Sequence, residues 1–297
     1  MANRILIISL CYLFALCSSC SKGPEIHTKP PVEIHADEKA LIANEAEIVA
    51  NAPKSSNKFA FDLYKDLATE ESNLVFSPFS ISLALAMTYA GAKGDTAAAI
   101  KKVFYFGDNT LDFHKSFGEL ASLLVSKDRK ALDTKLMIAN GLWLQSGFNV
   151  LQPFKNTLKV AYHSQLTELD FAHEPGPSTK KINVTVSEQT AGEIDKLLKQ
   201  DLKKTTQFVI TNAIYFKSKW RSPFEANKTA KRRFLKNNGQ SVDTDFMMQT
   251  HRFPYGENEQ KQFLMMPYKD ADFAAFFILP RENQLASVEN GLNDVSV

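Results

Sequence analysis

The pattern of apolar and polar positions predicts helices in the first half of the chain and strands mainly in the second. Apolar residues recur at helical spacing in 80–90, 96–104, 114–125, 153–162 and 179–198, the last range interrupted at Gly192. Alternating or continuous apolar runs predict strands at 135–144, 165–171, 207–216, 242–249, 263–268 and 273–279. Because helices and strands do not alternate regularly, the pattern predicts an α+β domain and not a doubly wound parallel sheet.

Two local patterns indicate where helices begin. Apolar positions from Phe59 to Leu67 recur at helical spacing, and Ser55 or Ser56 is placed to cap that helix. In the stretch GAKGDT, Gly91 is expected to end one helix and Asp95 to cap the next. This stretch lacks the residue order of a phosphate-binding loop and follows a helix, which argues against nucleotide binding.

The N-terminal segment differs in pattern from the rest. Residues 1–19 contain one charge, Arg4, and an apolar stretch too short to span a membrane, which predicts an export signal. Residues 20–54, which include Pro24, Pro30 and Pro31, are predicted to form a tether, and residues 55–297 the folded domain. We therefore expect a secreted or extracellular protein.

Cysteine usage adds one candidate modification. All three cysteines lie within or at the edge of the signal segment, so the exported protein keeps at most Cys20 and has no internal disulfide. The sequence before Cys20 resembles the lipid-attachment site of bacterial lipoproteins, although Cys17 stands where that site usually has Leu. A lipidated Cys20 would tether the domain to a membrane surface without spanning it, and plain secretion is the alternative.

Charge and motif content exclude several classes of function. The net charge is +2, from 35 basic and 33 acidic residues, and it predicts no binding to nucleic acid. The six histidines show no metal-ligand spacing, so neither a metal nor another cofactor is expected. No serine stands in a nucleophile elbow, so we expect no catalytic residue and no enzyme. Ester hydrolysis abolished by Ser77→Ala would support the alternative, a hydrolase.

Two polar features stand inside apolar surroundings. Ser77 or Ser80 is expected to cap the helix that follows, with Pro78 in its first turn, but capping explains only one of the two serines. Asn212 interrupts a run from Phe208 to Phe216 that is apolar on both faces, as in a strand buried on both sides. A buried amide needs polar partners, and a capping serine is a candidate; the alternative places Asn212 at a strand end facing water.

Several motifs in order and at matching spacing make the chain resemble the serpins, the loop-inserting serine protease inhibitors, most closely their bacterial and other non-vertebrate members. The resemblance runs from about Ser55 to Leu292. The motifs are NLVFSPFSI at 73–81, YAGAKGDT at 89–96, ANGLWLQ at 139–145, KIN at 181–183, QTAGEI at 189–194, TNAIYFKSKW at 211–220, MMQ at 247–249, MPY at 266–268 and ILP at 278–280.

The resemblance implies the serpin fold, with three β-sheets and surrounding helices. It implies a monomer whose partner is a target serine or cysteine protease: the protease cuts a reactive loop, which then inserts into the central sheet. In the family, the residues matching Ser77, Ser80 and Asn212 form the shutter, the polar patch where the central strands separate. The residue matching Trp220 lies in the breach, where insertion begins.

Serpins continue beyond the segment that matches the C-terminal part of this chain. We expect the fold to be incomplete at the C-terminus, because the hinge and reactive loop would follow Val297. By this interpretation the chain is a truncated serpin, inhibitory only in its full-length form. A non-inhibitory serpin-fold binding protein or chaperone is the alternative, and a hinge rich in small residues would distinguish the inhibitor.

Overall fold

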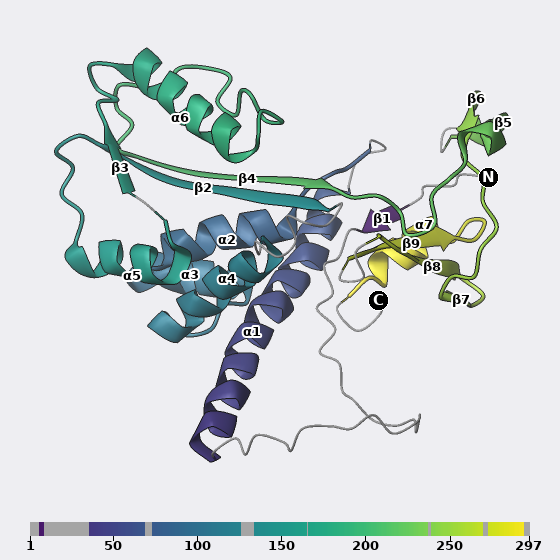
Figure 1. Cartoon of the computed structure of the whole chain (residues 1–297), viewed down its shortest axis with the longest axis horizontal. Coiled ribbons are helices and arrows are strands. Elements are labelled where there is room, and N and C mark those ends of the chain that lie inside the picture. Colours follow the sequence, from purple (N-terminus) through teal and green to yellow (C-terminus); the bar gives the residue numbers. More distant parts are fainter. Residues whose placement is uncertain are drawn as a thin grey trace, which may run out of the picture.

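A computed structural model describes residues 6–8, 36–68, 73–125, 134–164, 166–236, 239–269 and 273–293. Helices dominate the first half and strands the second, which confirms the predicted α+β class (Figure 1). In chain order the elements are β1 (Leu6–Ile8), α1 (Ala36–Leu67), α2 (Pro78–Tyr89), α3 (Gly94–Phe104), α4 (Leu111–Leu124), β2 (Lys135–Gln145), α5 (Gln152–Tyr162), β3 (Leu166–Leu169), α6 (Pro175–Gln189), β4 (Phe208–Lys217), the short 3-10 helix η2 (Ala226–Lys228), β5 (Ala230–Leu235), β6 (Ser241–Phe246), β7 (Tyr255–Glu257), β8 (Lys261–Pro267), β9 (Ala274–Pro280) and α7 (Leu285–Asn290).

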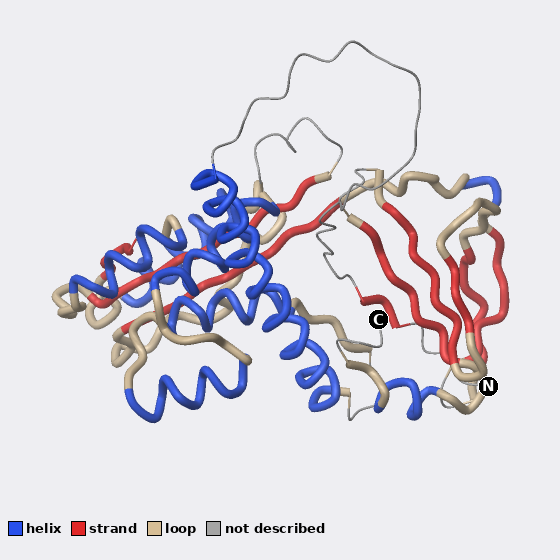
Figure 2. The backbone as a smooth tube through the Cα atoms, turned by 90° about the horizontal axis from the view of Figure 1, so that it is seen from below, coloured by secondary structure: helices blue, strands red, loops and turns tan. Residues whose placement is uncertain are grey.

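The strands form three sheets. One has the order β3-β2-β4, with β2 and β4 antiparallel and β3 parallel to β2. A second, antiparallel throughout, has the order β1-β9-β8-β7, and β5 and β6 form a two-stranded third sheet. Figure 2 shows most of the helices gathered around β2 and β4, with the other two sheets at the opposite end of the molecule.

The long strands β2 and β4 are covered on both faces. Figure 1 shows α6 over one face and α2, α3 and α4 on the other. On the α6 side, Ala139 of β2 and Ala213 of β4 pack with Val186 of α6. On the helical side, Leu142 belongs to the main core cluster. This double coverage explains why the sequence of β4 is apolar on both faces.

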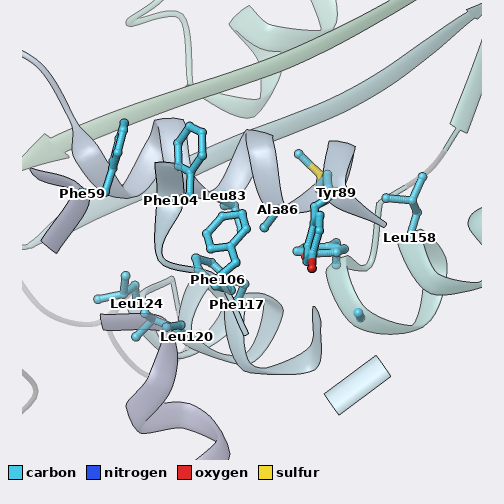
Figure 3. Packing of buried hydrophobic residues seen from close by; sticks show 14 of the residues in the cluster. Phe59, Leu83, Ala86, Tyr89, Phe104, Phe106, Phe117, Leu120, Leu124 and Leu158 are labelled. Carbon is cyan, nitrogen blue, oxygen red and sulfur yellow. The ribbon is translucent and has the colours of Figure 1, made fainter. Parts of the chain in front are cut away.

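The main core is an aromatic cluster between the helices and β2 (Figure 3). Phe104, Phe106 and Phe117 form a continuous row of rings, with centroids 5.3 Å and 5.2 Å apart. Phe117 is fully buried, as are Leu83 and Met87 of α2. Burying aromatic and aliphatic side chains of this size supplies the largest stabilising contribution in a domain of this kind.

Two predicted caps are wrong. Ser55 and Ser56 do not begin a helix, because α1 runs through them from Ala36, inside the segment predicted as a tether. The Ser55 hydroxyl donates instead to the Tyr105 carbonyl oxygen at 2.9 Å. Asp95 lies in the first turn of α3, whose N-cap is Lys93, so it adds a negative charge near the helix N-terminus and is not the cap.

The remaining boundaries differ modestly from the predicted ones. Helix α2 has Ala90 as its C-cap in place of Gly91, and α6 ends at Gln189, before the predicted interruption at Gly192. Gly192 has a φ of +80°, which favours glycine. The strand predicted at 242–249 is the shorter β6, and the sequence pattern did not reveal β5 or β7.

The close approach of α4 to α5 yields the first testable prediction. A Cβ atom added at Gly118 would lie 1.6 Å from the Ala161 carbonyl oxygen. Because the obstacle is backbone, Gly118→Ala forces the two helices apart and is expected to lower the free energy of unfolding by about 3 kcal/mol. Urea denaturation measures this loss. Gly256→Ala is the control, since a Cβ there meets nothing within 4 Å; equal effects of the two substitutions would contradict the prediction.

Candidate functional site

The first polar feature is the start of α2. Ser77 is the N-cap, with a φ of −114°, and its hydroxyl oxygen accepts a hydrogen bond from the Ser80 amide at 3.3 Å. Pro78 occupies the first turn, where its missing N–H costs nothing. The predicted cap is therefore confirmed, and Ser77 is the residue that forms it.

The second serine has a different environment. The Ser80 hydroxyl is buried and has no hydrogen-bond partner among the described residues, and the same holds for Ser82, which is 0% exposed. Helix α2 packs against β4. An unpaired buried hydroxyl costs about 1–3 kcal/mol, so the Ser80 hydroxyl does not stabilise the helix. The sequence pattern did not single out Ser82.

Asn212 lies in the middle of β4, directly opposite Asn140 of β2. Its side-chain Nδ2 donates to the Asn140 Oδ1 at 2.6 Å. The expectation of a nearby polar partner is confirmed, but the partner is Asn140 and not a capping serine. The alternative of a strand end facing water is wrong, because the Asn212 Oδ1 is buried and lacks a partner among the described residues.

A second polar contact stands next to the Asn140–Asn212 pair. The Trp143 indole Nε1 donates to the Thr211 Oγ1 at 3.0 Å, and both side chains are buried. Gly141 permits this contact, since a Cβ there would lie 2.5 Å from both atoms. The centre of the β2–β4 pair therefore carries two adjacent cross-strand polar contacts inside an otherwise apolar sheet.

Trp220 lies apart from the asparagine pair, where the chain leaves β4 and meets the β8–β9 sheet. Its ring stacks on Tyr268 with centroids 4.5 Å apart and planes 8° apart, and the two residues form an isolated antiparallel bridge. Backbone hydrogen bonds from Lys269 to Lys219 at 2.7 Å and from Arg221 to Pro267 at 3.1 Å fix the junction. Trp220 therefore joins the two larger sheets.

Other sequence predictions fall partly outside the described ranges. Cys20, the predicted lipidation site, lies outside them, as does most of the predicted signal 1–19. Within that signal the structure describes Leu6–Ile8, which forms β1 on the edge of β9. Among the described residues, no three His, Cys, Asp or Glu side chains gather to hold a metal ion. None of the described helices combines the length and apolar character needed to cross a bilayer.

The fold and this site define an α+β protein whose central strand pair is covered on both faces yet contains a polar centre. The family model described as serpin (serine protease inhibitor) matches residues 54–297. The chain therefore belongs to the serpin family, as its sequence motifs indicated.

Relatives of the chain include archaeal proteins. The chain is 38% identical over 241 residues to an uncharacterized serpin-like protein of Thermococcus kodakarensis, an alignment covering 81% of this chain and 56% of the relative. It is 32% identical over 287 residues to an uncharacterized serpin-like protein of Methanosarcina acetivorans, covering 96% and 67%. The chain thus spans between about half and two thirds of the length of these relatives.

Solved structures support the same fold. Reactive-loop-cleaved human thyroxine-binding globulin matches with a TM-score of 0.75 and 28% identity, over 84% of this chain and 74% of that protein. Emu ovalbumin matches with a TM-score of 0.75 and 23% identity, over 82% and 67%, which shows the fold alone. The predicted serpin fold is confirmed.

The asparagine pair yields the second prediction. Asn140→Ala and Asn212→Ala each leave a half-buried amide without its partner, so each is expected to lower the free energy of unfolding by about 1–3 kcal/mol. The double substitution removes both amides and should cost less than the sum, giving a coupling energy of about 1 kcal/mol or more. Urea denaturation of the four proteins measures this. Asn140→Ala combined with Asn227→Ala, an exposed site on η2, should be additive. If the free-energy changes were additive for both pairs of substitutions, the Asn140–Asn212 hydrogen bond would not contribute to stability and the prediction would be wrong.

Proposed function

We propose that the full-length protein is an inhibitor of serine or cysteine proteases that inserts its cleaved reactive loop as an extra strand next to β4. The family supports this function. Among the described residues, β4 pairs with β2 alone, so the ten-residue strand has an open outer edge. An open edge offers backbone N–H and C=O groups to an incoming strand. Sequence outside this chain would supply the loop.

The observation that carries the proposal is the unused hydrogen-bonding capacity of polar side chains near this edge. Asn212 holds Asn140 through its Nδ2, while its buried Oδ1 has no partner among the described residues. The same is true of the Ser80 hydroxyl on α2, within the part of the chain that the structure describes. Groups with spare hydrogen-bonding capacity can exchange partners when strands separate. Separating the strands then costs less free energy than it would if their contact were fully apolar. We therefore assign Ser77, Ser80 and Asn212 to the shutter, with Asn140 as the partner of Asn212.

Trp220 has a different part in the proposal. Its stack on Tyr268 holds the end of β4 to the β8–β9 sheet, so this end of the strand is anchored while the outer edge is open. We assign Trp220 to the breach, the place where insertion would begin. No residue has a catalytic role in this mechanism, because the protease itself carries out the cleavage.

Complex formation tests the inhibitor directly. The full-length protein is incubated with trypsin-, elastase- and subtilisin-like serine proteases and a papain-like cysteine protease. We expect a covalent complex with at least one of them, visible as a detergent-resistant band of summed mass. Complete proteolysis of the reactive loop without any complex would contradict the proposal.

A substitution at the asparagine pair tests the shutter assignment in the same protein. Asn212→Ala removes the Asn140 partner, so the energy of separating the strands changes. We expect a several-fold change in the number of inhibitor molecules consumed per protease inhibited, together with polymers formed at a lower temperature. Asn227→Ala, exposed on η2, is the matched control and should behave as wild type. Unchanged inhibition and polymerisation in Asn212→Ala would refute the assignment.

A non-inhibitory binding protein is the second candidate function. Two of the matched structures are thyroxine-binding globulin and ovalbumin. Their names do not describe protease inhibition, so the fold by itself leaves both functions available. A full-length protein that is cleaved as a substrate by every protease tested would favour this candidate.

We further propose that the protein is exported and held at a membrane surface by a lipid on Cys20, as a monomer. The cellular source is grown with a radiolabelled or alkyne-tagged fatty acid. We expect label in the wild type and none in Cys20→Ser. Cys17→Ser is the control and should keep its label. Free, unlabelled protein in the medium from wild-type cells would instead indicate plain secretion.

A further inference from the structure

Asn140 and Gly141 form an Asn–Gly pair in the middle of β2. In such a pair the glycine nitrogen can attack the asparagine side-chain amide, because glycine has no side chain to hinder the approach and its backbone rotates freely. The sequence contains two further pairs of this kind, at 238–239 and 290–291. Asn290 is the exposed last residue of the short helix α7, whereas Asn140 lies in a long paired strand (Figure 1).

Packing explains why a glycine follows Asn140. A Cβ at position 141 would lie 2.5 Å from the Thr211 Oγ1 and 2.5 Å from the Trp143 Nε1, the two atoms of the neighbouring cross-strand contact. Asn140 itself is the partner of Asn212. Two structural contacts of the sheet therefore bring a chemically reactive pair of residues together.

The pairing with β4 engages the nitrogen that would attack. The Gln145 amide donates to the Gln207 carbonyl oxygen at 2.9 Å, whereas the next amide along the chain donates to β3 on the opposite side. In an antiparallel ladder, hydrogen-bonded pairs alternate with non-hydrogen-bonded pairs. Because the register is continuous, the alternation makes Gly141 opposite Thr211 a hydrogen-bonded pair. The Gly141 N–H is therefore directed at β4.

The amide group that would be attacked is held as well. By the same alternation, Asn140 and Asn212 form a non-hydrogen-bonded pair, in which facing side chains come closest. The Asn212 Nδ2 donates to the Asn140 Oδ1 at 2.6 Å and so fixes the orientation of the Asn140 amide. Ring closure also needs rotation of the extended backbone at Asn140. Attack therefore requires the strand pairing and the side-chain bond to open together at this point.

We propose that Asn140 is a deamidation site whose reaction is gated by separation of β2 from β4, so that opening of the strand pair leaves an irreversible chemical mark. The Gly141 nitrogen bonds to the Asn140 Cγ, its proton and the side-chain NH2 leave together as ammonia, and a cyclic succinimide remains. Water then opens the ring. Cleavage of the Cγ–N bond gives aspartate, and cleavage of the backbone C–N bond gives isoaspartate, whose main chain runs through the former side chain.

Both products weaken the strand pair. Isoaspartate lengthens the main chain of β2 by one methylene group, so the hydrogen-bond alternation cannot be kept on both sides of residue 140. Aspartate still accepts from the Asn212 Nδ2, but it brings a negative charge into a half-buried position. A molecule that has opened and reacted is therefore less able to re-form its central pairing. The inference does not depend on protease inhibition, because it concerns the β2–β4 pair alone.

Peptide mapping by mass spectrometry measures the reaction. The protein is held at mildly alkaline pH, in native buffer and in urea above its unfolding transition, and deamidation is read from the mass gain of each Asn–Gly peptide. We expect Asn140 to react at least about 100-fold more slowly in the native protein than in the unfolded chain, because central strands open rarely. Asn290 is the internal reference and should be slowed less. Equal rates for Asn140 in both conditions, or no reaction in the unfolded chain, would overturn the proposal.

Asn212→Ala tests the gate. The substitution removes the bond to the Asn140 amide and weakens the strand pair. We expect deamidation of Asn140 in the native protein to become at least about fivefold faster, while its rate in the unfolded chain stays the same. Asn227→Ala, exposed on η2, is the control and should change neither rate. An unchanged native rate in Asn212→Ala would refute gating by strand separation.

A series of urea concentrations below the unfolding transition needs no variant and decides the matter if Asn212→Ala fails to fold. Urea promotes the exposure of buried surface, so the rate at Asn140 should rise steadily along the series. Hydrogen exchange in the peptide that contains the Gly141 amide should rise in parallel, because both reactions need the same opening. A rate at Asn140 that stays constant while this amide exchanges faster would overturn the proposal.

Discussion

The antiparallel pairing of β2 with β4 is the constraint on which the rest of the structure depends. Ten residue pairs, from Lys135 opposite Lys217 to Leu144 opposite Phe208, run through the centre of the molecule. The main aromatic core packs on one face and α6 on the other, so a slip of one residue would exchange the two faces. The hydrogen bond between Asn140 and Asn212 forms only in the observed register, which gives the pair a role in specifying it.

The same strand pair also determines how the sheets are connected. Just after β4, Trp220 stacks on Tyr268 and so ties this end of the strand to the β8–β9 sheet. On the other face, the Asn183 side chain of α6 exchanges two hydrogen bonds with the Leu198 backbone, at 2.9 Å and 2.8 Å, and so fixes the segment that returns to β4. Both connections hold β4 in place from outside its own strand pairing.

Sequence reasoning identified the features that depend on local chemistry. Ser77 as a cap and β4 as a strand buried on both faces follow from residue types within a few positions. Contacts between distant segments were not predictable in this way: Asn140, 72 positions from Asn212, becomes its partner only through strand register. The Ser55 cap failed for a related reason, because tertiary packing continues α1 through Ser55 and leaves its hydroxyl to Tyr105, 50 positions away.

The polar centre of the β2–β4 pair is not what stability alone would select. Well-packed apolar residues of similar volume would remove the cost of the unpaired Asn212 Oδ1 and Ser80 hydroxyl. Register could be specified by the Trp143–Thr211 contact, which satisfies both of its groups. The hydrogen-bonding capacity that Asn212 leaves unused among the described residues is the feature on which the proposed strand insertion depends. A strand added at the outer edge of β4 is a structural change that would bring another partner within reach.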